Sequence, residues 1–271
     1  MSRASMAPLE SMPAAQRLGV RGVLMDIDDT LTTEGKLTAE AYAALERLKR
    51  AGRLVIPVTG RPAGWCDHIA RMWPVDGVVG ENGAPSMRYD ASSRKLVRRF
   101  MVNDAKRVMQ RAQLYDIGHR ILRMVPGAAF ASDQRYRETD IAIDFCEDVP
   151  ALPPRDVDRI VELMQAEGLT AKVSSIHVNG WFGRYDKLTM AKTLLAEGFG
   201  IDLEHDRERF VFVGDSPNDA PMFAYFPLAV GVANLRAFAD RIDTLPAYVT
   251  RREAGAGFAE LTRFLLEGTP G

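Results

Sequence analysis

Three carboxylates fall within four residues at the point where an apolar segment ends. The segment Gly22–Met25 is followed by Asp26, Asp28 and Asp29 in the stretch LMDIDDTLT. Aspartate and threonine are frequent in turns and at helix N-termini, so one interpretation is a charged turn. The other is a metal and phosphate site in which one carboxylate is a nucleophile. The second interpretation requires partner residues from elsewhere in the chain.

Polar residues also follow two other apolar segments that we expect to be strands. Residues 54–58 precede Thr59, and residues 210–213 precede the sequence GDSPND at 214–219. The carboxyl ends of parallel strands meet at one edge of a sheet. We therefore expect oxygen ligands suited to Mg²⁺ to converge there: Asp26, Asp28, Thr59 and Asp215.

Strand and helix signals alternate on both sides of a long middle segment. Before it we expect, in order, elements at 20–27, 38–50, 54–58, 62–73 and 77–80. After it we expect elements at 187–197, 210–213, 217–225, 228–232, near Tyr248 and at 257–266. Short buried strands separated by helices predict an α/β fold, a doubly wound parallel sheet of Rossmann-like type.

The middle segment has a different pattern, which predicts an inserted α+β domain. Strands are expected at 86–89, 121–124 and 140–144, and helices at 102–115 and 156–167. The predicted organisation is a flexible tail at 1–18, a core domain formed by 19–84 and 184–271, and a cap domain at 85–183.

Composition excludes several classes of function. The 271 residues contain 35 Lys and Arg against 36 Asp and Glu, a net charge of −1, so no charge surplus points to nucleic acid or an acidic membrane. The two cysteines, Cys66 and Cys146, lack zinc-ligand spacing. Neither a bilayer span nor a secretion signal is evident, and we expect a cytoplasmic protein. The oligomeric state stays open.

Four separated motifs resemble, in order, those of the haloacid dehalogenase superfamily. They are DIDDT at 26–30, VTGRP at 58–62, Asp186-Lys187, and GDSPND at 214–219. The resemblance spans nearly the whole chain. The α+β insert between the second and third motifs, preceded by ENGA at 81–84, resembles the sucrose-phosphatase and Cof-like branch. Two departures are Leu188, where the family often has glycine, and Pro217 inside the fourth motif.

The resemblance implies a role for each polar residue. Asp26 would attack phosphorus to give an aspartyl-phosphate, and Asp28 would act as general acid and base. Thr59 would bind the transferring phosphoryl oxygens, and Lys187 would offset their negative charge. Asp29 is expected to be a turn or helix-start residue.

The resemblance also implies a Mg²⁺ cofactor. Its ligands would be the side chains of Asp26 and Asp215 and the backbone carbonyl of Asp28. Asn218 and Asp219 would orient this site from behind. For Asn218 and Ser216, capping of the following helix is an alternative role.

The implied substrate is a small phosphorylated metabolite, and the branch favours a sugar phosphate. The residues predicted to bind it are Thr59, Gly60, Arg61, His177, Asn179 and Lys187, with Ser174 and Ser175 nearby. For His177 the alternative is an ordinary core or surface histidine, and for Arg61 it is a structural ion pair. Trp181 and Phe182 are expected to pack in a core.

The predicted function is a Mg²⁺-dependent phosphatase. A phosphosugar mutase with the same paired aspartates is one alternative, and a non-catalytic protein that binds a phosphometabolite is another. Dehalogenation is disfavoured, because the sequences that resemble dehalogenases lack the second aspartate, which is present here as Asp28.

Overall fold

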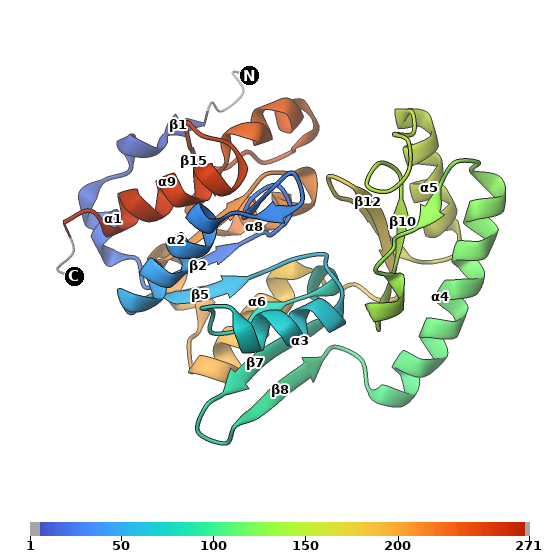
Figure 1. The fold of residues 1–271 in the computed structure, drawn as a ribbon, viewed down its shortest axis with the longest axis horizontal. Coiled ribbons are helices and arrows are strands. Elements are labelled where there is room, and N and C mark those ends of the chain that lie inside the picture. The colour runs from blue at the N-terminus through green and yellow to red at the C-terminus, as the bar shows by residue number, and fades with distance from the viewer. Residues whose placement is uncertain (1–5, 269–271) are drawn as a thin grey trace.

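A six-stranded sheet forms the centre of the molecule in a computed structural model that describes residues 6–268 (Figure 1). Its strand order is β1-β15-β14-β13-β2-β5, and every neighbouring pair is parallel. The strands are β1 (Ala7–Pro8), β2 (Gly22–Met25), β5 (Leu54–Pro57), β13 (Phe210–Gly214), β14 (Leu228–Gly231) and β15 (Tyr248–Val249). The predicted doubly wound α/β fold is confirmed.

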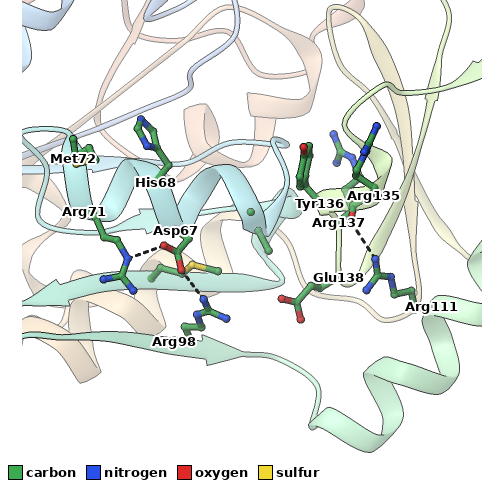
Figure 2. A pocket seen from close by; sticks show the side chains of 13 residues that line it. Asp67, His68, Arg71, Met72, Arg98, Arg111, Arg135, Tyr136, Arg137 and Glu138 are labelled. Atoms are coloured by element: carbon green, nitrogen blue, oxygen red, sulfur yellow. Dashed lines mark hydrogen bonds and ion pairs between the residues drawn. The ribbon is translucent and has the colours of Figure 1, made fainter.

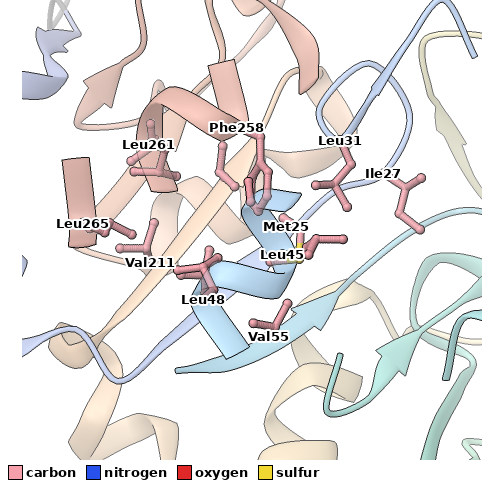
Figure 3. Packing of buried hydrophobic residues seen from close by; sticks show 14 of the residues in the cluster. Met25, Ile27, Leu31, Leu45, Leu48, Val55, Val211, Phe258, Leu261 and Leu265 are labelled. Atoms are coloured by element: carbon pink, nitrogen blue, oxygen red, sulfur yellow. The ribbon is translucent and has the colours of Figure 1, made fainter. Parts of the chain in front are cut away.

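Helices cover both faces of this sheet. They are α1 (Ala14–Gly19), α2 (Ala39–Arg50), α3 (Ala63–Met72), α6 (Lys187–Phe199), α7 (Leu203–Asp206), α8 (Ala220–Tyr225) and α9 (Ala254–Leu266). One apolar cluster joins α2, α3 and α9 to the sheet, and a second joins α6 and α8 to its other face. In the first cluster, Leu45, Leu48 and Phe258 pack over Met25 and Val55 (Figure 3).

Alternation of side chains along β2 explains the two clusters. Val23 and Met25 belong to the first cluster, whereas Leu24 between them belongs to the second. Successive residues of a strand point to opposite faces, so an all-apolar strand buries both. Burial on both faces, with β13 and β5 as neighbours, fixes β2 within the sheet and therefore fixes the position of Asp26 at its end.

Helix α2 shows how local sequence sets the element boundaries. The Thr38 hydroxyl accepts a hydrogen bond from the backbone N–H of Ala41, which caps the first turn. The helix ends at Arg50, and Gly52 follows with a φ of +71°. Glycine adopts this left-handed conformation without the steric cost that a Cβ imposes.

A hairpin follows the second motif and extends the core rather than the cap. Strand β6 (Val78–Val79) bridges to Val58 beside the main sheet and pairs with β7 (Pro85–Asp90), which pairs with β8 (Lys95–Phe100). Met87 of β7 packs in the first core cluster. The predicted cap boundary at residue 85 therefore falls before a hairpin that is built into the core.

A second, antiparallel sheet forms the cap, seen on the right of Figure 1. Its strands are β9 (Ala129–Phe130), β10 (Asp140–Asp144), β11 (Thr170–Val173) and β12 (His177–Trp181), and its helices are α4 (Asp104–Met124) and α5 (Pro154–Ala166). Ile141, Ile143 and Val178 pack against these helices. The alternate residues of β10 and β12 form the opposite face, whose polar members are Asp140, Asp144, His177 and Asn179.

The prediction of a strand at residues 121–124 is wrong, because these residues form the last turn of α4. Leu114, Ile117 and Ile121 are all buried and lie at spacings of three and four residues. This is the period of a helix face, and it extends the helix through a segment that looks alternating when taken alone.

Part of the predicted N-terminal tail is folded. Residues 1–5 lie outside the described residues, but β1 pairs with β15 and α1 follows it. Leu9 and Met12 are buried in the first core cluster. Two apolar anchors therefore hold a segment whose Ala, Ser and Pro content predicts mobility. Across residues 6–268, no helix combines the length and apolar character needed to cross a bilayer.

A short hairpin, β3 (Thr32–Thr33) with β4 (Lys36–Leu37), follows the first motif. Gly35 lies in its turn with a φ of +70° and open space around it. Gly83, in the 3-10 turn η2 (Glu81–Gly83), also has a positive φ, of +112°. A Cβ on Gly83 would overlap the backbone carbonyl of Asp186, immediately before Lys187.

Replacing Gly83 with alanine is expected to destabilise the protein and to displace Lys187. Gly35→Ala is the matched control, because it carries the positive-φ cost of about 1–2 kcal/mol without a clash. Gly83→Ala should lower the free energy of unfolding by about 1–3 kcal/mol more than the control, as overpacked sites typically do. Urea denaturation of both variants measures the difference, and equal losses would contradict this packing.

Candidate active site

A buried lysine and two aspartates form the centre of the polar cluster at the carboxyl edge of the sheet. Asp26 follows β2, Lys187 begins α6, and Asp219 ends the 3-10 turn η5 (Pro217–Asp219) after β13. Lys187 Nζ lies 2.6 Å from Asp26 Oδ1 and 2.7 Å from Asp219 Oδ1. The ammonium thus holds the two carboxylates on either side of it.

A third carboxylate, that of Asp215, completes the cluster. Thr30 donates a hydrogen bond of 3.0 Å to its Oδ1, while Oδ2 is buried without a hydrogen-bond partner among the described residues. Asp26, Asp215 and Asp219 each offer a carboxylate oxygen within 4.8 Å of the others. An unpartnered buried oxygen within such a set fits a hard cation such as Mg²⁺.

The titration of these groups reflects burial of like charges. Burial raises the pKa of Asp26 to about 8 against the opposing pull of Lys187, and burial together with Asp26 and Asp219 raises the pKa of Asp215. Burial acts to lower the pKa of Lys187, but Asp219 and Asp26 outweigh it and raise that pKa. A divalent cation at the carboxylates would favour their charged forms.

Asp219 supports its neighbours rather than facing the cavity. Its Oδ1 is taken by Lys187, and its Oδ2 accepts a hydrogen bond of 3.2 Å from the backbone N–H of Asp215. It is fully buried. Through these contacts Asp219 holds Lys187 and the backbone of Asp215, and its orienting role at a metal stays a prediction. Ser216 instead donates to Asn218 Oδ1 at 2.8 Å, and both side chains line the cavity beside Asp26.

Thr59 lies at the end of β5, as predicted, and is fully buried. Its hydroxyl accepts a hydrogen bond of 3.0 Å from the backbone N–H of Arg61, and its own N–H donates to the carbonyl of Val79. The loop 59–61 is therefore held in a fixed turn. Gly60 and Arg61 line the same cavity as Asp26 and Asp28.

The Arg61 guanidinium is bound by three carboxylates. Its Nε lies 2.9 Å and 3.0 Å from the two oxygens of Asp28, and its other nitrogens contact Asp133 at 3.3 Å and Glu147 at 2.8 Å. It also stacks over the Trp65 ring. Asp133 and Glu147 belong to the cap, so Arg61 ties the cap to Asp28. Binding of substrate by Arg61 would require exchange of one of these partners.

A second arginine, Arg137 of the cap, is fully buried in the same network. It donates to Asp133 at 3.0 Å, to both oxygens of Asp140 at 3.0 Å and 3.1 Å, and to the backbone carbonyl of Gly60 at 2.8 Å. The bond to Gly60 crosses from cap to core. Arg61 and Arg137 together place two guanidinium groups beside Asp133 at the domain interface.

Glu81 fixes the start of the cap connection against the core. It is fully buried, and its Oε1 accepts hydrogen bonds from the N–H groups of Ala63 and Glu138 at 2.8 Å and 2.9 Å. Its Oε2 accepts from the backbone and hydroxyl of Thr139. Glu81 has a φ of +42°, so the backbone is strained where this carboxylate joins α3 to the cap.

The polar face of the cap sheet closes the cavity. His177 and Asn179 alternate along β12 and, with Ser174 and Ser175, line the same small cavity as Asp26, Asp28 and Arg137. Asn179 donates to Asp140 at 3.0 Å, and His177 Nε2 lies 2.9 Å from Glu147. The predicted residues His177 and Asn179 therefore face the Asp26 cluster, while Trp181 packs in the cap next to Tyr185.

Sequence patterns did not reveal the cap's charged residues. Asp133, Arg137 and Glu147 stand in a polar stretch that has no motif spacing, and only the tertiary fold brings them to Arg61. The one available signal was the alternation of residues 140–144, which predicts that Asp140 and Asp144 share a face with Ala142 between them.

A family model described as haloacid dehalogenase-like hydrolase matches residues 23–140. This segment contains the first two motifs, and the later motifs complete the cluster around Lys187. Over this segment the chain resembles the haloacid dehalogenase-like hydrolases. The curated relatives of this chain are named as phosphatases, which supports a phosphatase.

Two curated proteins resemble this hydrolase along most of its length. The phosphoglycolate phosphatase of Methanosarcina mazei is 26% identical over 252 residues, which are 90% of this chain and 96% of the relative. The phosphoglycolate phosphatase of Methanosarcina acetivorans is 27% identical over 256 residues, with the same coverage of both chains.

Solved structures of phosphatases share the fold. The C-terminal domain of Candida albicans trehalose-6-phosphate phosphatase has a TM-score of 0.68 at 15% identity, covering 97% of this chain and 99% of that one. The sucrose-phosphatase of Synechocystis has a TM-score of 0.62 at 17% identity, with coverages of 91% and 98%. The predicted sucrose-phosphatase and Cof-like type of fold is confirmed.

The contact between Glu147 and its partners gives this hydrolase a pH-dependent tie between cap and core. The close contacts with His177 and Arg61 lower the pKa of Glu147 to about 2, against the opposing effect of burial. A carboxylate whose pKa is lowered by folding stabilises the folded state above its unfolded pKa, and this contribution fades as pH falls toward the folded pKa.

Glu147→Gln is expected to lower the melting temperature at pH 6, and the gap from the parent should narrow as the pH falls from about 5 toward 3. The matched control is Glu162→Gln, on the exposed face of α5, where a surface ion pair with Arg159 contributes little. Melting curves across this pH range test the prediction. A gap that stays constant with pH would refute a role for the Glu147 charge.

Proposed function

We propose that this hydrolase is a Mg²⁺-dependent phosphatase that acts through an aspartyl-phosphate on Asp26. The observation that carries the proposal is the buried ion pair of Lys187 with Asp26 and Asp219, beside the unpartnered oxygen of Asp215. An ammonium held against one carboxylate offsets the charge that gathers when that carboxylate attacks a phosphate.

In the proposed reaction, an oxygen of Asp26 attacks phosphorus and the bond from phosphorus to the alcohol oxygen breaks. Asp28 gives a proton to the departing alcohol. Asp28 then takes a proton from water, whose oxygen attacks phosphorus and releases inorganic phosphate and free Asp26. The Arg61 contact holds the Asp28 side chain at the cavity and must loosen while Asp28 exchanges its proton.

Asp26, Asp215 and the backbone carbonyl of Asp28 would hold Mg²⁺, which when bound supplies positive charge to the phosphate oxygens. Lys187 contributes a fixed positive charge through its 2.6 Å contact with Asp26. Asp219 keeps Lys187 in place through its 2.7 Å contact. Thr59, at the end of the neighbouring strand, is the proposed donor to a phosphoryl oxygen.

For the substrate we favour a small sugar phosphate. The cap side of the cavity presents hydroxyl and amide groups from Ser174, Ser175 and Asn179, which suit the hydroxyl groups of a sugar. The curated relatives are named for phosphoglycolate, whose second group is a carboxylate. Arg61 and Arg137, the guanidinium groups available to such a carboxylate, are already bound by protein carboxylates.

Phosphate release from pentose and hexose phosphates, phosphoglycolate and nucleotides tests the function. With Mg²⁺ we expect the amount of inorganic phosphate released to equal the amount of alcohol formed. With a chelator we expect no phosphate release. Asp26→Asn should lower kcat by at least about a thousandfold, because it removes the nucleophile, while its melting temperature stays close to that of the parent. Retained metal-dependent turnover by this variant would disprove the assignment.

The same panel tests the substrate class. We expect a higher kcat/KM for a sugar phosphate than for phosphoglycolate. The reverse order would reject the sugar-phosphate proposal while leaving the phosphatase intact. An isomeric sugar phosphate formed without inorganic phosphate would indicate a mutase instead.

A further inference from the structure

A second pocket, outside the Asp26 cavity, opens between the core and the cap (Figure 2). We call it the arginine pocket and define it by His68, Arg71, Arg98, Arg111, Arg135 and Tyr136. His68 and Arg71 lie on α3, and Arg98 lies on β8, all in the core. Arg111 lies on α4, and Arg135 and Tyr136 on the 3-10 turn η3 (Gln134–Tyr136), all in the cap.

The charge of the arginine pocket is not balanced by its own carboxylates. Asp67 contacts both Arg71 and Arg98, at 2.7 Å and 2.5 Å, so one carboxylate serves two guanidinium groups (Figure 2). Glu138, at the pocket wall, is paired with Arg107 at 2.9 Å. Four arginines against one shared carboxylate leave a surplus of 4 − 1 = 3 positive charges.

The two cap arginines carry most of that surplus. Arg111 donates to the backbone carbonyl of Arg135 at 3.2 Å, and Arg135 lies over the Tyr136 ring. Neither has a carboxylate partner in the ion pairs recorded for residues 6–268. Both side chains are exposed, so their remaining N–H groups are open to a ligand.

The pocket has the size and the chemistry of an anion site. It has a volume of about 700 Å³ and is open to solvent. One guanidinium group can donate two parallel hydrogen bonds to the oxygens of a phosphate. Several guanidinium groups around one concave surface therefore favour a ligand with more than one phosphate. The net charge of the whole chain is −1, so this concentration of arginine is local.

We propose that the arginine pocket binds a small molecule carrying two or more phosphates and that the ligand bridges core and cap. At the pocket wall the two domains already touch, since a Cβ on Gly64 of α3 would lie 3.0 Å from Cβ of Tyr136. A ligand held by Arg98 on one side and Arg111 on the other binds only when the two sides are close. Its binding therefore favours the conformation in which the cap lies on the core.

Isothermal titration of the purified full chain with inorganic pyrophosphate, in the presence of a chelator, tests the site. We expect Arg98→Ala and Arg111→Ala each to weaken binding about tenfold or more, as loss of a charge-assisted contact does. The matched controls are Arg99→Ala, on β8 but paired with Glu197, and Arg120→Ala, on α4 but paired with Glu167. Both controls should bind as the parent does.

Each other result overturns a part of the proposal. No binding by the parent rejects the site. Binding that survives both Arg98→Ala and Arg111→Ala places the anion elsewhere, such as the Asp26 cavity. Loss of binding in only one of the two variants refutes the bridge. Hydrogen exchange gives an independent readout. Pyrophosphate should slow the amide exchange of residues 134–139 in the parent and should not change the exchange of these residues in Arg98→Ala.

Discussion

The ion pairs of the Lys187 ammonium with Asp26 and Asp219 are the interaction on which the rest of the site depends. Asp26, Asp215 and Asp219 are buried close together, and without a nearby cation their mutual repulsion and lost hydration would strongly favour protonation. Lys187 contacts two of them directly and is itself buried. Removing one partner of such a buried pair typically costs about 3–5 kcal/mol, because the other charge stays buried and unpaired.

The fold brings these groups together with little freedom. Asp26 follows a strand that is buried on both faces, Asp215 follows the neighbouring strand in register, and Lys187 begins a helix packed on the same sheet. The Gly83 turn lies against the backbone just before Lys187. Each residue of the cluster is therefore positioned by core packing rather than by a mobile loop, which is how rigid elements preorganise a site.

The cap is connected to this centre by charge rather than by apolar packing. Arg61 joins Asp28 to Asp133 and Glu147, and Arg137 reaches from the cap to the carbonyl of Gly60. Such contacts are directional and exchangeable, whereas the cap's apolar cluster lies on the far side of its sheet. A polar interface of this kind allows relative motion of domains more readily than an apolar one.

Much of the core and of the carboxylate cluster at the sheet edge is predictable from the sequence. The convergence of Asp26, Thr59 and Asp215 follows from the rule that parallel strands present their carboxyl ends at one edge. Lys187 was not placed by that rule, because it begins a helix, and it was found through the resemblance of its motif. The N-terminal segment was predicted to be mobile because its composition outweighed Leu9 and Met12, whose burial depends on distant strands.

The cap could be predicted less well, for a physical reason. Its half-exposed strands and amphipathic helices have similar short patterns, so residues 121–124 appeared extended although they end α4. The contacts of Arg137 and Glu147 depend on how two domains meet. No local propensity records that arrangement. The role of Asp26 as nucleophile stays a prediction, as do the roles of the other site residues.

Mass spectrometry of an acid-quenched phosphoenzyme is the most direct test of the central claim. Asp28→Asn should still allow Asp26 to attack, but it removes the group that activates water, so the intermediate should accumulate. After mixing with a substrate from the panel, the account predicts one phosphoryl group on the peptide that contains Asp26. A phosphoryl group on any other residue would contradict it.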